Sequence, residues 1–141
     1  MNEGELYFRE LENDTLARTI WGEARGEGSI GMQAVAAVIM NRLQISKEKG
    51  RFWWGSSIIE ICQKPYQFSC WNRDDPNYRK VLNVDRRDKI FAKACDIARC
   101  CLPDPTAGAT HYHARGIYPF WSRHQKPTAI IGHHIFYRIL T

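Results

Sequence analysis

Residues 14–42 read DTLARTIWGEARGEGSIGMQAVAAVIMNR, two segments of helical periodicity joined by glycines. In the first segment, Asp14 is the expected N-cap, and Gly26 or Gly28 marks the expected end of the helix. The apolar residues of this segment recur on one broad helical face: Leu16, Ala17, Ile20, Trp21 and Ala24. The sequence therefore predicts a helix that packs one face on a core.

The second segment is small or apolar on nearly all sides. Ser29 is its expected cap, and the helix is predicted over residues 30–42. Because a helix without a polar face is normally buried, this helix is predicted to lie at the centre of the domain.

The middle of the chain carries weaker signals. Between residues 46 and 83 the periodicity fades and aromatic residues accumulate, which predicts a long loop with one helical turn around residues 57–62. Asp85 is the expected cap of a third helix, which Pro103 ends. A long aromatic loop of this kind either covers the core or lines a binding cleft.

Two segments near the C-terminus, residues 110–114 and 130–139, have the composition of strands. A long excursion, residues 115–129, separates them, so an antiparallel pair is the simplest topology. Helices first and strands last predict an α+β fold, with several helices and a small antiparallel sheet near the C-terminus.

Composition limits the class of protein. The chain has 141 residues, of which 44% are hydrophobic and 25% charged, as expected for one globular domain. The longest apolar run, residues 34–40, is far shorter than the roughly 20 residues of a membrane span. The N-terminus has no apolar stretch typical of a signal peptide, so synthesis in the cytoplasm is expected.

The charge favours an anionic partner. Twenty Lys and Arg against fifteen Asp and Glu give a net charge of +5. Nucleic acid, an anionic membrane surface and an acidic cell-wall polymer all fit this charge, and composition does not choose among them.

The five cysteines are expected to be structural thiols in a reduced chain. Their number is odd and their spacing matches no zinc motif. They are Cys62, Cys70, Cys95, Cys100 and Cys101.

Glu23 stands where the helical pattern calls for an apolar residue. It lies seven residues after Leu16 and three after Ile20, within about 20° and 60° of them on a helix. Glu23 is therefore predicted to be partly buried, with Trp21 nearby. Burial disfavours the charged form of a carboxyl group, which is what a general acid needs near neutral pH. Glu27 is either a solvated residue of the helix end or a second catalytic carboxylate.

Four stretches occur in order along the chain. They are ARTIWGEARGE (17–27) with GMQAVAAVIMNR (31–42), QKPYQFS (63–69), DPTAGATHY (104–112), and Trp121 leading to IGHHIFY (131–137). In this order they closely resemble the catalytic-domain family of spore cortex-lytic type cell-wall hydrolases. The stretches span about residues 16–138, so the resemblance implies a single catalytic domain over residues 1–141.

The resemblance implies a lysozyme-like domain that cuts peptidoglycan glycan strands between N-acetylmuramic acid and N-acetylglucosamine. Members of the family act mainly as lytic transglycosylases, and their catalytic acid/base corresponds to Glu23 in this chain. Attack by the 6-hydroxyl of the sugar leaves a 1,6-anhydro product, whereas attack by water makes the enzyme a muramidase.

The same resemblance implies a groove without metal or cofactor, in a monomer that binds peptidoglycan and not nucleic acid. The expected substrate-binding residues are Trp21, Glu27, Gln67, Phe68, Tyr112 and Trp121. A basic, leaderless catalytic domain resembles a bacteriophage endolysin, which acts on the wall after release at lysis.

Two further hypotheses about function stay open from the sequence. One is a zinc peptidase or amidase that uses several of the histidines His111, His113, His133 and His134. Because His133 and His134 would point to opposite faces of a strand, at most one of them joins the other two. The other reading is a non-catalytic module that binds glycan or nucleic acid through its aromatic residues.

Overall fold

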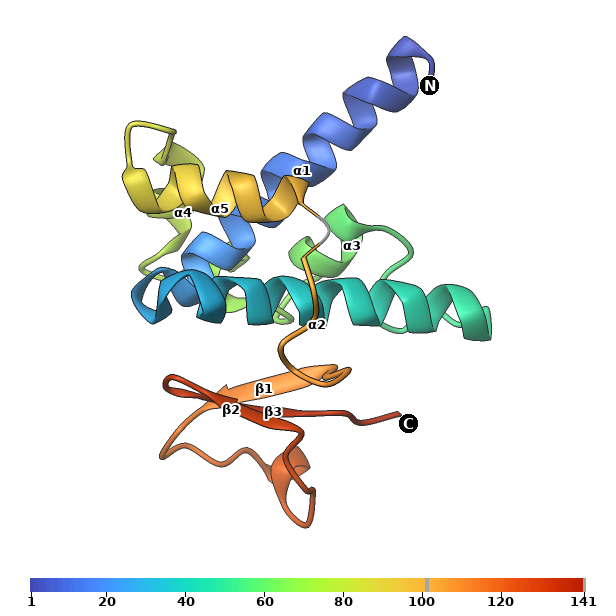
Figure 1. Ribbon diagram of the computed structural model, residues 1–141, viewed down its shortest axis with the longest axis vertical. Coiled ribbons are helices and arrows are strands. Elements are labelled where there is room, and N and C mark those ends of the chain that lie inside the picture. The colour runs from blue at the N-terminus through green and yellow to red at the C-terminus, as the bar shows by residue number, and fades with distance from the viewer. Residues whose placement is uncertain (101, 141) are drawn as a thin grey trace.

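The computed structural model describes residues 1–100 and 102–140. Helix α2 (Gly28–Lys49) lies between a group of helices and a small sheet (Figure 1). Helix α1 (Glu3–Ala24) crosses α2 on the side away from the sheet. The predicted α+β fold, with an antiparallel sheet near the C-terminus, is confirmed.

Helix α1 begins much earlier than predicted. Its N-cap is Asn2, whose side chain accepts a backbone hydrogen bond of the first turn. The prediction of Asp14 as N-cap is wrong, because Asp14 lies inside the helix and pairs with Arg18 at 2.9 Å. Residues 3–11 are exposed, so the buried stripe that marks this helix in the sequence starts only at Leu16.

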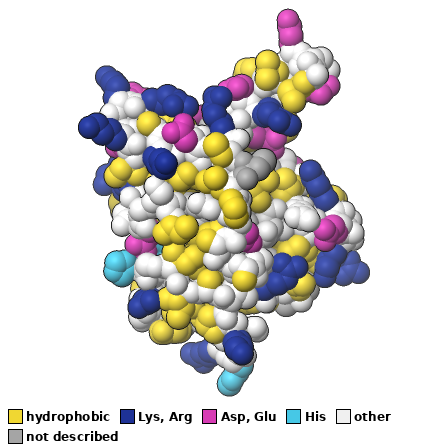
Figure 2. All heavy atoms as spheres, viewed as in Figure 1, with side chains coloured by type: hydrophobic (Ala, Val, Ile, Leu, Met, Phe, Trp, Pro, Cys, Tyr) yellow, Lys and Arg dark blue, Asp and Glu magenta, His cyan; other side chains and the backbone are white. Residues whose placement is uncertain are grey.

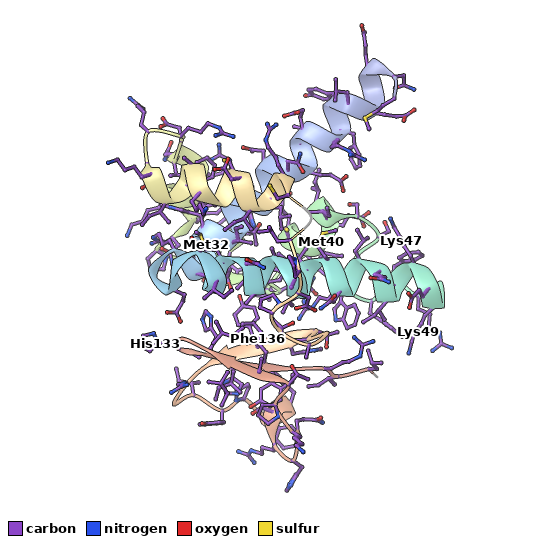
Figure 3. The ribbon with its side chains drawn as sticks, viewed as in Figure 1. Met32, Met40, Lys47, Lys49, His133 and Phe136 are labelled. Carbon is purple, nitrogen blue, oxygen red and sulfur yellow. The ribbon has the colours of Figure 1, made fainter. Side chains whose placement is uncertain are left out.

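Helix α2 is central, as predicted, because opposite faces of it join different apolar clusters. Val35 and Ile39 pack with the helices, whereas Ala34 and Val38 pack with Phe136 of the sheet. Figure 3 shows Phe136 between the sheet and α2. A helix covered on both sides needs no polar stripe, which explains its sequence.

The ends of α2 differ from the prediction. The helix starts at Gly28 and its cap position is Glu27, so the prediction of Ser29 as cap is wrong. It continues past Arg42 to Lys49, where Gly50 ends it in the left-handed conformation with a φ of 62°.

The predicted middle loop contains three short helices. The helical turn predicted around residues 57–62 is confirmed as α3 (Ile58–Gln63), which Ser57 caps. Helices η2 (Ser69–Trp71) and α4 (Tyr78–Asn83) were not predicted. They are too short to show a helical period in the sequence.

Helix α5 (Lys89–Arg99) has the predicted apolar face but a different cap. The side chain of Asp88 accepts a backbone hydrogen bond of the first turn, so Asp85 as cap is wrong. Asp85 instead binds the guanidinium of Arg87 at 2.6 Å. The helix ends before Pro103 is reached.

The sheet has three strands in the order β1-β3-β2, and each pair is antiparallel. They are β1 (His111–Ala114), β2 (Ala129–Ile131) and β3 (His134–Tyr137). The prediction of one strand over residues 130–139 is wrong, because this segment folds back as a hairpin. Gly132 has a φ of 58° at the first position of the two-residue turn, as a type II′ turn requires. Helix η3 (Phe120–Ser122) lies in the excursion between β1 and β2.

The four described cysteines are free, as expected for structural thiols: Cys62, Cys70 and Cys95 are buried, and Cys100 is exposed. Burial raises the pKa of Cys62 to about 12, so this thiol stays protonated at neutral pH. Cys101 lies outside the described residues. None of the helices in the described part of the chain combines the length and apolarity that crossing a bilayer needs.

Candidate active site

A pocket of about 260 Å³ lies where the last turn of α1 meets β1, η3 and the segment between α3 and η2. Five of the predicted site residues line it: Glu23, Gln67, Phe68, Tyr112 and Trp121. Four further residues complete the lining: Arg42, Tyr66, Ser69 and His111. Of these, only His111 had a predicted role, as a candidate zinc ligand. The pocket therefore joins residues from both helical and sheet parts of the fold.

Glu23 is half-buried, as predicted, and two donors from different elements hold its carboxylate. Its Oε1 accepts a hydrogen bond from the Tyr112 hydroxyl at 2.6 Å, and its Oε2 accepts one from the backbone N–H of Cys70 at 3.4 Å. The helix approaches η2 this closely because residue 22 is glycine. A Cβ at Gly22 would lie 2.9 Å from the Cβ of Cys70.

Tyr112 lies on β1 opposite Phe136 of β3. Its ring packs on His134 and Phe136, at centroid distances of 4.9 and 5.6 Å. Burial, reinforced by the neighbouring Glu23 carboxylate, raises the pKa of Tyr112 well above its ordinary value. The hydroxyl therefore stays protonated and is a permanent donor to Glu23.

The other three predicted residues in the pocket differ in what they offer a ligand. The side-chain nitrogen of Gln67 donates to two backbone carbonyls, at 2.7 and 3.1 Å, and so holds its own loop in place. Phe68 is only 2% exposed and supports the pocket from the core. Trp121 is half-buried, and its ring lies 5.2 Å from that of His111. Trp121 is thus the best placed of the three to stack on a sugar.

Tyr66 directly precedes Gln67 and Phe68 and has an unusual backbone conformation. Its φ of 64° lies in the left-handed region, which is uncommon for an aromatic residue, and the residue is 85% exposed. The side chain of Asn72 accepts a hydrogen bond from the Tyr66 N–H at 3.2 Å and fixes this conformation. Strained backbone of this kind clusters at binding sites. In the sequence, only the position of Tyr66 within the stretch 63–69 could have marked it as a site residue.

Sequence reasoning missed Arg42 and predicted His111 only as a candidate zinc ligand. Arg42 projects from α2, where its Nε donates to the carbonyl of Thr110 at 2.7 Å and its guanidinium faces the rings of Trp54 and Phe68. Burial lowers the pKa of Arg42 to about 10 and that of His111 to about 4. At neutral pH Arg42 is therefore charged and His111 neutral. The sequence signal that could have identified Arg42 is its position, since it is a cation at the end of an otherwise apolar segment.

Trp21 and Glu27 lie outside the pocket. Trp21 is 6% exposed and packs edge-on against Phe91 in the core. Two positions along a helix differ by about 200°, so Trp21 and Glu23 point in different directions. Glu27 binds the hairpin turn, where its Oε1 accepts from the backbone N–H of His133 at 2.8 Å. Figure 3 shows His133 at this end of the sheet.

The histidines do not form the ligand set of a zinc site. His113 Nε2 lies 2.8 Å from the Tyr137 hydroxyl, and His133 lies in the turn and not in a strand. Within residues 1–100 and 102–140, no group of three or more His, Cys, Asp or Glu side chains is placed to hold a metal ion. The arrangement gives no support to a zinc peptidase.

Glu23 thus lies in an aromatic-lined pocket between a helical body and a small antiparallel sheet. The chain belongs to the cell wall hydrolase family, whose model matches residues 26–137. That range contains every pocket residue except Glu23, which lies just before it.

One relative and two solved structures are similar to this chain. The spore cortex-lytic enzyme of Halalkalibacterium halodurans is 32% identical over 124 residues, which are 86% of this chain and 33% of that enzyme. The chain thus spans about a third of that relative's length. The catalytic domain of the Bacillus cereus SleB protein has a TM-score of 0.67 at 23% identity, over 90% of this chain and 89% of that one. The catalytic domain of the germination-specific lytic transglycosylase SleB from Bacillus anthracis has the same TM-score and identity, over 90% and 93%. At this identity the two structures show a shared fold.

Proposed function

We propose that the protein cleaves the bond between N-acetylmuramic acid and N-acetylglucosamine in peptidoglycan, as a lytic transglycosylase with Glu23 as its acid and base. The observation that carries the proposal is the carboxylate of Glu23, held at the pocket by Tyr112 and by the N–H of Cys70. Family membership and the names of the related spore cortex-lytic enzyme and lytic transglycosylase support this substrate and reaction.

The two oxygens of Glu23 are suited to different tasks. Oε1 accepts the short hydrogen bond from Tyr112, whereas Oε2 accepts the longer bond from the Cys70 N–H. Oε2 is therefore the oxygen available to carry a proton. It gives the proton to the bridging oxygen as the C1–O bond breaks and C1 gains oxocarbenium character. The same oxygen then takes the proton of the sugar's own 6-hydroxyl, whose oxygen bonds to C1.

The number of carboxylates favours this intramolecular attack over hydrolysis. Glycosidases that use water ordinarily place two carboxyl groups about 5 to 9.5 Å apart across the bond. Among the described residues that line the pocket, Glu23 is the only Asp or Glu, and Glu27 is engaged by the hairpin. The 6-hydroxyl needs no second carboxylate to activate it, since Glu23 already serves as the base.

Glu23→Gln tests the proposal, because it keeps the shape of the side chain and removes the titratable proton. We expect the parent protein to clear a suspension of purified peptidoglycan, and the variant to bind the wall with clearing reduced at least about a thousandfold. Glu48→Gln, on the exposed end of α2, is the matched control and should clear normally. Equal clearing by Glu23→Gln and the parent would overturn the role of Glu23.

Mass spectrometry of the released muropeptides decides the reaction type. Anhydro ends are expected, whereas reducing ends would identify a muramidase. If the protein binds the wall and releases no muropeptide, it is a non-catalytic glycan-binding module. Loss of clearing in EDTA would indicate a metal enzyme.

The proposal treats the protein as a monomer. A bacteriophage origin and release at lysis stay predictions from the resemblance.

A further inference from the structure

Arg42 is a buried cation without a buried anion beside it. It is 8% exposed, and it lines the pocket together with Glu23. No ion pair joins it to an Asp or Glu of the described chain, and its one hydrogen bond there runs from Nε to a backbone carbonyl. Buried charges are normally paired, because removing an ion from water is energetically costly.

The surroundings of Arg42 offset only part of that cost. The rings of Trp54 and Phe68 lie 5.4 and 5.5 Å from its guanidinium carbon. Such cation–π contacts stabilise a buried cation by less than its desolvation costs. The two terminal nitrogens make no hydrogen bond to the described residues. The guanidinium therefore keeps its paired donors available to a ligand.

Neither Glu23 nor His111 neutralises Arg42. Glu23 is engaged by Tyr112 and by the N–H of Cys70 and forms no ion pair with Arg42. Arg42 is the only Lys or Arg among the described lining residues, and His111 is neutral at pH 7. The pocket thus contains a proton-transfer group and a separate cation that lacks a counter-ion.

We propose that Arg42 binds a carboxylate of the substrate, and that this group is the lactyl carboxylate of N-acetylmuramic acid set free when the stem peptide has been removed. This rests on the proposed function. A guanidinium presents two parallel N–H donors that match a carboxylate. The acetamido carbonyl, present on both sugars, is neutral and would leave the buried charge uncompensated. The lactyl carboxylate is the ionised group that the sugar itself carries.

If Arg42 binds this carboxylate, another reaction must free the carboxylate before this protein acts on the strand. In intact peptidoglycan the lactyl carbonyl is tied to the stem peptide as a neutral amide. Hydrolysis of that amide by an amidase-class enzyme breaks its C–N bond and consumes one water, which yields the free lactyl carboxylate and the free amino terminus of the released stem peptide. Strands denuded in this way are then the preferred substrate of this protein, and peptide-bearing strands are poorer ones.

Binding to the inactive Glu23→Gln protein tests the assignment without turnover. The probes are a tetrasaccharide of alternating N-acetylglucosamine and N-acetylmuramic acid with free lactyl groups, its methyl ester, its peptide-bearing form, and chitotetraose. We expect calorimetry to show the free acid bound at least about tenfold more tightly than the other three. Adding Arg42→Gln should remove this preference, and Arg42→Lys should restore part of it.

The methyl ester keeps the test valid if an Arg42 variant does not fold, since the ester removes the charge from the ligand and leaves the protein unchanged. Equal binding of ester and free acid would overturn the proposal, as would an equal loss for all four ligands in Arg42→Gln. If cleavage of peptidoglycan requires Glu23 while the four ligands bind alike, only the Arg42 proposal fails. If the parent releases no muropeptide but the preference persists, only the proposed function fails.

Discussion

Tyr112 is the residue on which the placement of Glu23 depends most directly, through the 2.6 Å hydrogen bond from its hydroxyl. Tyr112→Phe removes that donor and keeps the ring that packs on His134 and Phe136. A hydrogen bond to a charged group contributes about 1.5 to 3 kcal/mol, or roughly a 10- to 150-fold change in rate. We expect kcat for muropeptide release to fall within this range, with KM nearly unchanged.

Tyr137→Phe is the control for this prediction. It removes another buried hydroxyl of the sheet, 2.8 Å from His113 Nε2, at a position that does not line the pocket. Its kcat should equal that of the parent. Similar losses in both variants would show that a weakened sheet, and not the bond to Glu23, lowers the rate.

At the scale of elements, α1 meets η2 and α4 through a contact that requires glycine. A Cβ at Gly22 would lie 2.7 Å from a methyl group of Val81 and 2.9 Å from the Cβ of Cys70. Gly22→Ala should therefore lower the free energy of unfolding by about 1 to 3 kcal/mol and displace the N–H that binds Glu23. Chemical denaturation and wall clearing measure the two effects.

Gly26→Ala is the matched control, because no atom lies within 4 Å of the added methyl group and the φ there is not positive. Its stability should change by less than about 1 kcal/mol, or rise slightly. If Gly26→Ala is as damaging as Gly22→Ala, the close contact is not the cause.

The hairpin is attached to the start of α2 through Glu27. The hydrogen bond from the His133 side chain lowers the pKa of Glu27 below its ordinary value of 4.5. A carboxylate with a lowered folded-state pKa stabilises the fold above its unfolded pKa, and this stabilisation is lost as pH falls through the folded value. The parent should thus exceed Glu27→Gln in Tm at pH 7, and the difference should shrink toward pH 3. A difference in Tm that does not depend on pH would contradict the role of this charge.

At the scale of the whole molecule, charge is unevenly distributed. Residues 105–141 contain four Lys and Arg and no Asp or Glu, whereas residues 1–13 contain four Glu and one Arg. Figure 2 shows acidic side chains on the projecting N-terminal helix, with Lys, Arg and His at the opposite end. The predicted anionic partner is therefore expected to approach the sheet side, which also carries Tyr112 and Trp121 of the pocket.

Reversing charge near η3 tests this orientation. Arg123→Glu with Lys126→Glu should slow association with anionic cell wall by about tenfold at low salt, and added salt should reduce the difference. Arg86→Glu with Lys89→Glu changes the net charge equally at the start of α5. Equal slowing in both variants would mean that net charge alone drives association.

The sequence by itself determined the features that depend on local periodicity: the buried stripe of α1, the central position of α2, the α+β order and the partial burial of Glu23. The predictions made from the sequence are wrong where local signals are weak. The exposed start of α1 carries no buried stripe, and the hairpin turn inside residues 130–139 depends on a single glycine.

Only the tertiary structure decided which residues share the pocket. Tyr112 and Glu23 are 89 positions apart, and a periodic pattern shows which side of an element is buried but not which element covers it. For the same reason Arg42 and Tyr66 had no predicted role, while Trp21, close to Glu23 in sequence, points into the core. Periodicity reports burial, and only packing brings distant side chains within hydrogen-bonding distance.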